Sequence, residues 1–259
     1  MNILDQIIEY KKSEVAINKA QTPVEVLRQS ENYGRTCLSL KSFLLDPSKT
    51  GIIAEFKRKS PSKGIIHPNP DVVNITTAYC EGGASALSVL TDQQFFGGSN
   101  EDLMIARQNN IPILRKDFII DSYQIEEAKS IGADVILLIA ACLSKEEVRS
   151  LAKYAIQLGL EVLLELHDEL ELGHVCNEIS IVGINNRNLK TFEVDIEQSI
   201  RMAGQIDPSK VLVAESGISS AEEVKYFKSK GVKGFLMGEY FMKHNDPGRA
   251  FHDFVKSLS

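Results

Sequence analysis

The sequence lacks the features that would mark a metal centre, a nucleic-acid binder or a membrane protein. Its four cysteines form no CxxC pair, and its five histidines show neither HxH nor HExxH spacing. The net charge is −6, with no basic tail or stripe to offset it. No apolar run approaches the ~18 residues of a membrane span, and the N-terminus lacks the apolar core of a signal peptide. We therefore expect a cytoplasmic protein with reduced thiols, no metal, and no nucleic-acid or membrane partner.

Two motifs of common enzyme classes are also missing. There is no GxSxG elbow for a nucleophilic serine and no GxGxxG loop for a dinucleotide, so the sequence predicts no cofactor. What remains is an ordinary globular composition, with 259 residues, 43% of them hydrophobic and 25% charged. That length suits either two small domains or a single α/β barrel, which typically has about 250 residues.

Short apolar runs recur along the chain and predict buried parallel strands, because such strands are covered on both faces. Helical patterns such as residues 144–159 lie between them, and several predicted helices end in a glycine suited to the left-handed conformation. Eight such βα units predict an α/β fold, the closed (β/α)8 TIM barrel. A doubly wound open sheet is the alternative. The runs span residues 52–57, 86–90, 111–116, 134–140, 160–166, 181–186, 211–216 and 234–238.

About fifty residues precede the first predicted strand. Ile3, Leu4, Ile7 and Ile8 form the apolar face of an amphipathic helix. Neither this helix nor the one predicted after it has a core of its own. We therefore expect one barrel domain over residues 1–259, in which residues 1–50 are a helical extension that covers the barrel mouth.

Ionisable side chains follow the apolar part of several predicted strands. Side chains alternate along a strand, so Ile53, Glu55 and Lys57 share one face, which points into a barrel. Barrel enzymes place their chemistry at the C-terminal mouth, and we expect a polar ring there. His167 is interpreted as a rim or core residue. The other strand ends contribute Arg115, Lys116 and Asp117; Glu165; Asn185, Asn186 and Arg187; and Glu215, Ser216 and Gly217.

The last two predicted strands suggest a phosphate site. Ser216-Gly217 follows the seventh strand and Gly238-Glu239 follows the eighth. Barrels often bind phosphate with backbone N–H groups of these two loops and a nearby helix N-terminus. Glycine allows the backbone to approach a ligand closely. Together with the lysines and carboxylates, the site favours general acid–base chemistry on a small anion carrying a carbonyl. A Schiff-base lysine enzyme would suit the same inventory.

The sequence resembles the indole-3-glycerol-phosphate synthase family of tryptophan biosynthesis over nearly the whole chain. The resemblance implies a carboxy-lyase without a cofactor. Its small-molecule phosphorylated substrate, 1-(2-carboxyphenylamino)-1-deoxyribulose 5-phosphate, is converted to indole-3-glycerol phosphate, carbon dioxide and water. We expect the chain to be a monomer. The stretches that carry the resemblance are IIAEFKRKSPSKG (52–64), SVLTDQQFFGGS (88–99), PILRKDFI (112–119), ADVILLIA (133–140), GINNRNL (183–189), VAESGI (213–218) and FLMGEYFMK (235–243).

The resemblance also implies roles for individual residues. Lys116 would be the general acid that protonates the substrate carbonyl, and Glu165 would move protons during dehydration. Lys57 would contact the anionic substrate or act as the acid for loss of the hydroxyl, and the assignment of lysines to steps stays open. The remaining implied residues are Glu55, Asn185, Arg187 and Glu215 in the polar ring; Ser60, Ser216, Gly217, Gly238 and Glu239 around the substrate; and Phe96, Phe118 and Leu137 as an apolar wall for the anthranilate ring.

Two positions depart from the family pattern. Glu239 stands where many members carry a small hydroxyl residue, and Phe95 stands where tyrosine is usual.

Three other functions are alternatives. The first is phosphoribosylanthranilate isomerase, although that family would place a cysteine where this chain has Glu55. A class I aldolase would form a Schiff base on Lys116. A catalytically dead barrel would only bind phosphorylated ligands.

Overall fold

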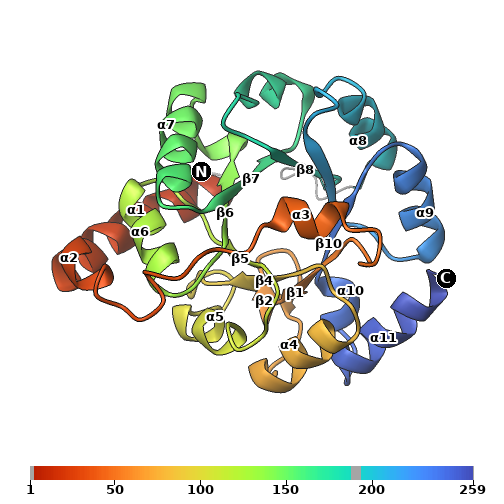
Figure 1. Cartoon of the computed structure of the whole chain (residues 1–259), viewed down its shortest axis with the longest axis horizontal. Coiled ribbons are helices and arrows are strands. Elements are labelled where there is room, and N and C mark those ends of the chain that lie inside the picture. The colour runs from red at the N-terminus through yellow and green to blue at the C-terminus, as the bar shows by residue number, and fades with distance from the viewer. Residues whose placement is uncertain (1–2, 188–193, 259) are drawn as a thin grey trace.

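The computed structural model describes residues 3–187 and 194–258, and its centre is a closed barrel of eight parallel strands (Figure 1). Around the barrel the order is β1-β10-β9-β8-β7-β6-β5-β4, and β4 pairs with β1 to close it. Both ends of each barrel strand lie within two residues of the ends of a predicted strand. The predicted TIM barrel is therefore confirmed, and the open sheet is excluded. The strands are β1 (Ile52–Phe56), β4 (Ala86–Leu90), β5 (Ile113–Lys116), β6 (Val135–Ile139), β7 (Glu161–Leu166), β8 (Ile181–Asn185), β9 (Val211–Glu215) and β10 (Gly234–Met237).

Helices surround the strands as an outer ring (Figure 1). The predicted helix at residues 144–159 is observed as α7, and four helices lead into the next strand through a glycine with φ between 79° and 94°, as predicted: Gly83, Gly132, Gly159 and Gly231. The ring contains α4 (Val72–Glu81), α5 (Asn100–Ala106), α6 (Ser122–Ser130), α7 (Lys145–Gln157), α8 (Ile196–Ala203), α9 (Ala221–Ser229), α10 (Glu239–Met242) and α11 (Pro247–Ser257). Shorter elements at the strand ends are the hairpin β2 (Lys59–Ser60) and β3 (Gly64–Ile65), with 3₁₀ turns at Ala140–Cys142 and Glu169–His174.

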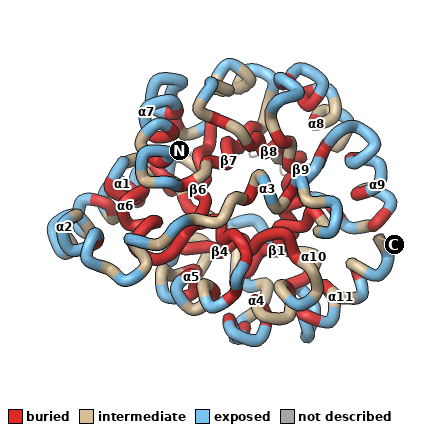
Figure 2. The backbone as a smooth tube through the Cα atoms, viewed as in Figure 1, coloured by how far each residue is buried: buried red, intermediate tan, exposed pale blue. Residues whose placement is uncertain are grey.

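The barrel strands are buried along most of their length (Figure 2), and they have two apolar layers because alternate strand residues face opposite sides. The larger layer lies between the strands and the helices and includes Phe56, Leu87 and Phe235. The smaller layer fills the barrel interior and includes Ile53, Leu114, Leu163 and Val213. All of these side chains are buried. The interior is therefore a packed core, and only its C-terminal end is available for a site.

The N-terminal extension reaches both ends of the barrel. Its helices are α1 (Ile3–Gln21), α2 (Val24–Leu27) and α3 (Leu40–Leu45). Residues of α1 line a pocket at the C-terminal mouth. Leu40 and Leu44 of α3 instead join the interior layer, and the backbone N–H of Lys41 donates to Glu161 at the start of β7. Of the predicted cover, α1 therefore lies at the mouth, while α3 closes the opposite end. Within residues 3–187 and 194–258, no helix combines the length and apolar character needed to cross a membrane.

Candidate active site

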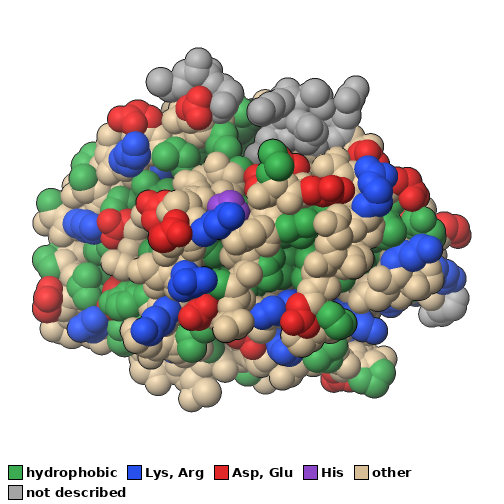
Figure 3. Space-filling view, turned by 90° about the horizontal axis from the view of Figure 1, so that it is seen from above, with side chains coloured by type: hydrophobic (Ala, Val, Ile, Leu, Met, Phe, Trp, Pro, Cys, Tyr) green, Lys and Arg blue, Asp and Glu red, His purple; other side chains and the backbone are tan. Residues whose placement is uncertain are grey.

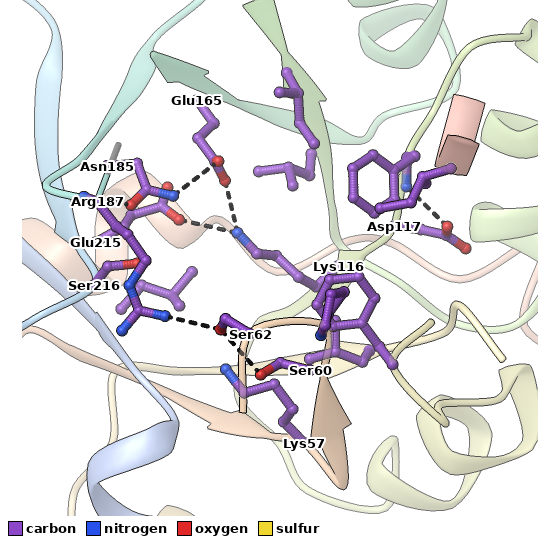
Figure 4. Close-up of a pocket in the computed structure, with 18 of the residues that line it drawn as sticks. Lys57, Ser60, Ser62, Lys116, Asp117, Glu165, Asn185, Arg187, Glu215 and Ser216 are labelled. Carbon is purple, nitrogen blue, oxygen red and sulfur yellow. Dashed lines mark hydrogen bonds and ion pairs between the residues drawn. The ribbon is translucent and has the colours of Figure 1, made fainter. Parts of the chain in front are cut away.

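Most of the residues predicted for the site meet at the C-terminal mouth of the barrel (Figure 4). Gly217, Gly238 and Glu239 line an adjoining pocket, which shares Glu55, Lys57, Arg187 and Ser216 with the main one. The predicted residues that line the main pocket are Glu55, Lys57, Ser60, Phe96, Lys116, Phe118, Leu137, Glu165, Asn185, Arg187, Glu215 and Ser216.

Lys116, the last residue of β5, is the centre of the polar network. Its Nζ lies 2.7 Å from Oε2 of Glu165 and 2.9 Å from Oε2 of Glu215. These carboxylates come from β7 and β9, so three strand ends converge on one ammonium group (Figure 4). Burial alone would lower the pKa of Lys116, but the carboxylates raise it well above its usual value. The lysine is therefore protonated at neutral pH and can deliver a proton.

The two carboxylates beside Lys116 differ in pKa. Burial would raise the pKa of Glu165, but Lys116 and His167 hold it well below its usual range. Burial raises the pKa of Glu215 to about 8, and the neighbouring charge of Glu165 adds to that effect. The pKa of Glu215 therefore lies above that of Glu165, so that Glu215 is the first of the two to take up a proton. Environments that separate the pKa values of two neighbouring acids assign them different acid–base roles.

His167, which the sequence indicated only as a rim or core residue, lines the pocket. Its Nε2 lies 2.9 Å from Oε1 of Glu165, and its Nδ1 lies 3.6 Å from Oε2 of Glu171. Burial would lower the pKa of His167, but the two carboxylates raise it to about 10. The imidazolium therefore keeps Glu165 ionised. The signal was available, because His167 stands two residues beyond Glu165 and shares its inward face.

Lys57 and Asn185 extend the polar ring. Nζ of Lys57 lies 2.6 Å from Oε1 of Glu55, and Nδ2 of Asn185 donates to Oε1 of Glu165 at 3.0 Å. Oδ1 of Asn185 accepts the backbone N–H of Arg187 at 3.1 Å, which orients the amide. Lys57 lines both pockets, so one cation faces the polar ring and the predicted phosphate loops.

An apolar wall faces the charged side of the pocket. The rings of Phe96 and Phe118 lie 6.0 Å apart between centroids, and Leu137 lies at the pocket floor within the interior core. Helix α1 adds Ile3, Leu4 and Ile7 to the same lining. The sequence predicted a helix over the mouth, but it did not predict that these side chains would enter the site.

The adjoining pocket has the backbone conformation expected of a binding loop. Ser216 and Gly217 both adopt left-handed φ values, of 65° and 72°. Ser216 is the only non-glycine residue with positive φ among residues 3–187 and 194–258, and such strain is common at functional sites. The N–H groups of Ser219 and Ser220, which precede α9, donate to Glu223 at 2.7 Å and 3.0 Å and are therefore not free for an anion.

Glu239 turns its carboxylate toward two cations at the rim of this pocket. Its Oε2 lies 3.3 Å from Nη2 of Arg187, and its Oε1 lies 3.5 Å from Nζ of Lys63. Gly238, next to it, allows close approach, because a Cβ there would come within 2.5 Å of Glu55 Oε1. The carboxylate of Glu239 therefore pairs with the two cations that lie beside the predicted phosphate loops.

Arg115 does not belong to the ring of charges at the mouth. It precedes Lys116 and points to the opposite side of the strand, where Nη2 lies 2.5 Å from Oε2 of Glu127 in α6. Alternation along β5 explains this, since only one of two neighbouring residues can face inward. The described residues also contain no group of three or more side chains placed to hold a metal ion.

Comparison with known proteins agrees with this geometry. A family model described as indole-3-glycerol phosphate synthase matches residues 4–254. Proteins of the same description from Bacteroides thetaiotaomicron, Bacillus cereus (strain G9842) and Acinetobacter baylyi are 49%, 45% and 42% identical to the chain. The alignments cover 99%, 97% and 96% of the chain, and 99%, 97% and 94% of the relatives. The chain belongs to the indole-3-glycerol phosphate synthase family.

Membership of the indole-3-glycerol phosphate synthase family makes the chain a carboxy-lyase of tryptophan biosynthesis with a phosphorylated substrate. The stretches that carried the resemblance contain barrel strands and the loops that follow them, except that Asn188 and Leu189 of GINNRNL lie outside the described residues. The resemblance to the indole-3-glycerol phosphate synthase family is therefore confirmed.

Solved structures of similar shape are more distant in sequence. The tryptophan synthase alpha subunit of Legionella pneumophila has a TM-score of 0.60 at 13% identity, and covers 85% of this chain and 96% of its own. A mutant tryptophan synthase alpha subunit from Pyrococcus furiosus has a TM-score of 0.62 at 16% identity, with 82% and 98% covered. At such low identity these structures establish the barrel fold alone.

Proposed function

We propose that Lys116 is the general acid of the synthase reaction and that Glu165 is its proton-transfer partner. The observation that carries this proposal is the buried ammonium of Lys116, which lies 2.7 Å from Glu165 and 2.9 Å from Glu215. Ring closure places negative charge on the carbonyl oxygen of the carboxyphenylamino-deoxyribulose phosphate. A fixed ammonium stabilises that charge and supplies the proton. Glu165, at 2.7 Å, can then receive a proton during dehydration.

The charges of the pocket fit a substrate with a phosphate and a carboxylate. The chain has a net charge of −6, and Figure 3 shows acidic and basic side chains interspersed on the face in view. The pocket is lined by Lys57, Lys116, Arg187 and His167, the pKa of which is raised to about 10. A cleft with low-dielectric walls focuses such a field on an anion. We infer that Lys57 contacts the substrate between its carbonyl and its phosphate, because it lines both pockets.

The remaining roles follow the two sides of the cavity. Phe96, Phe118 and Leu137 would hold the anthranilate ring against an apolar surface, where a carboxylate is favoured to leave as neutral carbon dioxide. The backbones of Ser216-Gly217 and Gly238-Glu239 would bind the phosphate, with Ser60 beside the substrate. Glu55, Asn185 and Glu215 would orient Lys57, Glu165 and Lys116 through the contacts described above.

We also infer the setting in which this site works. Residues 1–259 would form one barrel domain, with α1 of the extension over the mouth. The chain would act as a monomer in the cytoplasm, since every strand end of the proposed site comes from the same barrel.

A conversion assay tests the proposed chemistry. The purified chain is incubated with the carboxyphenylamino-deoxyribulose phosphate, and formation of indole-3-glycerol phosphate is followed by indole fluorescence. Borohydride is added to a parallel reaction. We expect product and no trapped substrate, because a general-acid lysine forms no imine. An adduct on Lys116 would instead assign the chain to Schiff-base chemistry.

A further inference from the structure

A buried lysine of α1 connects the helix over the mouth to both sides of the proposed active site. The side chain of Lys11 is 1% exposed, and its Nζ lies 3.0 Å from Oδ2 of Asp92 and 2.9 Å from Oδ1 of Asp117. A third carboxylate, Glu14 of the same helix, lies at 2.5 Å. Burial would lower the pKa of Lys11, but these carboxylates raise it above its usual value, so the ammonium stays charged.

Asp92 links Lys11 to the aromatic wall of the pocket. It is fully buried in the loop after β4. Its Oδ2 faces Lys11, while its Oδ1 accepts the backbone N–H groups of Phe95 at 2.7 Å and Phe96 at 3.1 Å. The two oxygens have separate tasks. One anchors α1, and the other fixes the turn that presents Phe96 to the pocket.

Asp117 links Lys11 to the end of β5. It directly follows Lys116, and its Oδ1 accepts the N–H of Phe118 at 2.8 Å as well as pairing with Lys11. Its Oδ2 accepts the hydroxyl of Thr91 at 2.6 Å. The backbone on the C-terminal side of Lys116 is thereby tied to the same ammonium as the Phe96 loop.

We infer that Lys11 is a positioning residue for the synthase reaction, which holds α1, the Phe96 loop and the end of β5 in one arrangement. An ion cluster this buried is a weak source of stability, because desolvation opposes the attraction between the charges. Its contacts instead join three separate chain segments that each supply pocket residues: Ile3 and Leu4, Phe96, and Lys116. Misplacing reacting groups by about 1 Å can cost about 10²-fold in rate, so the anchor acts on catalysis through geometry.

This inference rests on the proposed roles of Lys116 and Phe96, and it is tested with three variants. Lys11→Met removes the charge while keeping most of the bulk. Asp92→Asn keeps an oxygen for the two loop N–H groups and replaces the oxygen that faces Lys11. Lys12→Met is the matched control, since Lys12 is the next residue of α1 and is 62% exposed. For each variant, kcat and KM are measured well below its melting temperature, beside the wild-type enzyme.

We expect Lys11→Met to lower kcat/KM by about 10- to 100-fold, with kcat reduced and KM raised, while Lys12→Met matches the wild type. Asp92→Asn should change the same parameters, and the double variant should be little worse than the worse single one, because both break one anchor. A purely structural role would lower the melting temperature and leave kcat of the folded enzyme unchanged, which would overturn the inference. So would additive losses in the double variant. If Lys11→Met does not fold, Asp92→Asn decides alone by the same criterion. A wild-type chain that forms no product would refute the proposed function instead.

Discussion

The two ends of the barrel interior are built by the same strands but have opposite chemistry. On β1, β5, β7 and β9, one inward residue is aliphatic and the next, two positions later, is ionisable. The pairs are Ile53 and Glu55, Leu114 and Lys116, Leu163 and Glu165, and Val213 and Glu215. A single step along each strand therefore separates a packed core from a charged mouth. The core excludes water from one side of the charges, which strengthens their mutual interactions.

The N-terminal extension repeats this contrast. Helix α3 adds Leu40 and Leu44 to the apolar end, whereas α1 adds both apolar side chains and the buried charge of Lys11 to the mouth. The comparison teaches that stability and chemistry are spatially divided. Substitutions at the closed end should change the free energy of unfolding, and those at the mouth should change the rate.

The largest expected effect is a difference in rate between variants of Glu165 and Glu215, the two carboxyl groups beside Lys116. Glu165→Gln should lower kcat by about 10²-fold or more, because an ionised carboxylate that transfers protons is lost. Glu215→Gln should cost less than about tenfold near pH 7, because the raised pKa of Glu215 favours its protonated form, which the amide resembles. Steady-state rates on the same substrate compare them. Equal losses, or a larger loss for Glu215→Gln, would contradict the proposed division of roles.

At the closed end, Leu44→Ala should reduce the free energy of unfolding by about 2–5 kcal/mol, through lost burial and a cavity under α3. Its kcat at low temperature should match the wild type, because the site lies at the other end. Leu45→Ala is the matched control, since Leu45 is 49% exposed. Denaturant unfolding measures the stabilities. A Leu44→Ala chain of unchanged stability would show that α3 does not close the barrel.

The pH dependence of stability provides a smaller effect at the mouth. The pKa of His167 is raised in the folded chain to about 10, so its contribution is complete below the unfolded value of ~6.5 and is lost as pH rises toward 10. Glu215, raised to about 8, acts in the same direction between its ordinary value and pH 8. Between pH 7 and pH 9 the His167 share amounts to on the order of 2 kcal/mol. His167→Gln should remove that slope in urea titrations, and His244→Gln, at an exposed position, should keep it.

The smallest effect concerns Glu239, whose carboxylate forms ion pairs with Arg187 and Lys63. Glu239→Gln should lower KM by about two- to fivefold, because a partly exposed ion pair is worth about 0.2–1 kcal/mol and phosphate would no longer compete with it. The value of kcat should be unchanged. Glu222→Gln, on the exposed first turn of α9, is the control. A raised KM would mean that Glu239 helps to bind the substrate.

The repeat of apolar runs was enough to predict the fold. Each βα unit is local, and the alternation of side chains alone predicted that Glu55 and Lys57 lie on the inner face. The same alternation places Arg115, which was expected at the mouth, on the outer face, and it places His167, which was interpreted as a rim or core residue, on the inner face with Glu165. In both cases the information was present in the sequence.

Other features depend on packing between distant segments, which periodicity does not encode. Only the contacts of helix α3 show that it closes the opposite end of the barrel from α1. Lys11 reads as a surface lysine within a helix, and its burial depends on Asp92 and Asp117, which lie about eighty and a hundred residues further along the chain. The raised pKa of Glu215 likewise depends on burial and on the charges of Lys116 and Glu165, which come from β5 and β7.

The most direct test of the account is the single-turnover rate of Lys116→Met, measured with its free energy of unfolding. Methionine keeps much of the bulk and removes the charge and every donor. We predict a loss of ~10²–10⁴ in the rate of product formation, equivalent to about 3–5 kcal/mol of barrier, from a chain that still unfolds cooperatively. A folded variant that retains more than about a tenth of the wild-type single-turnover rate would contradict the account, because general-acid catalysis contributes more than that.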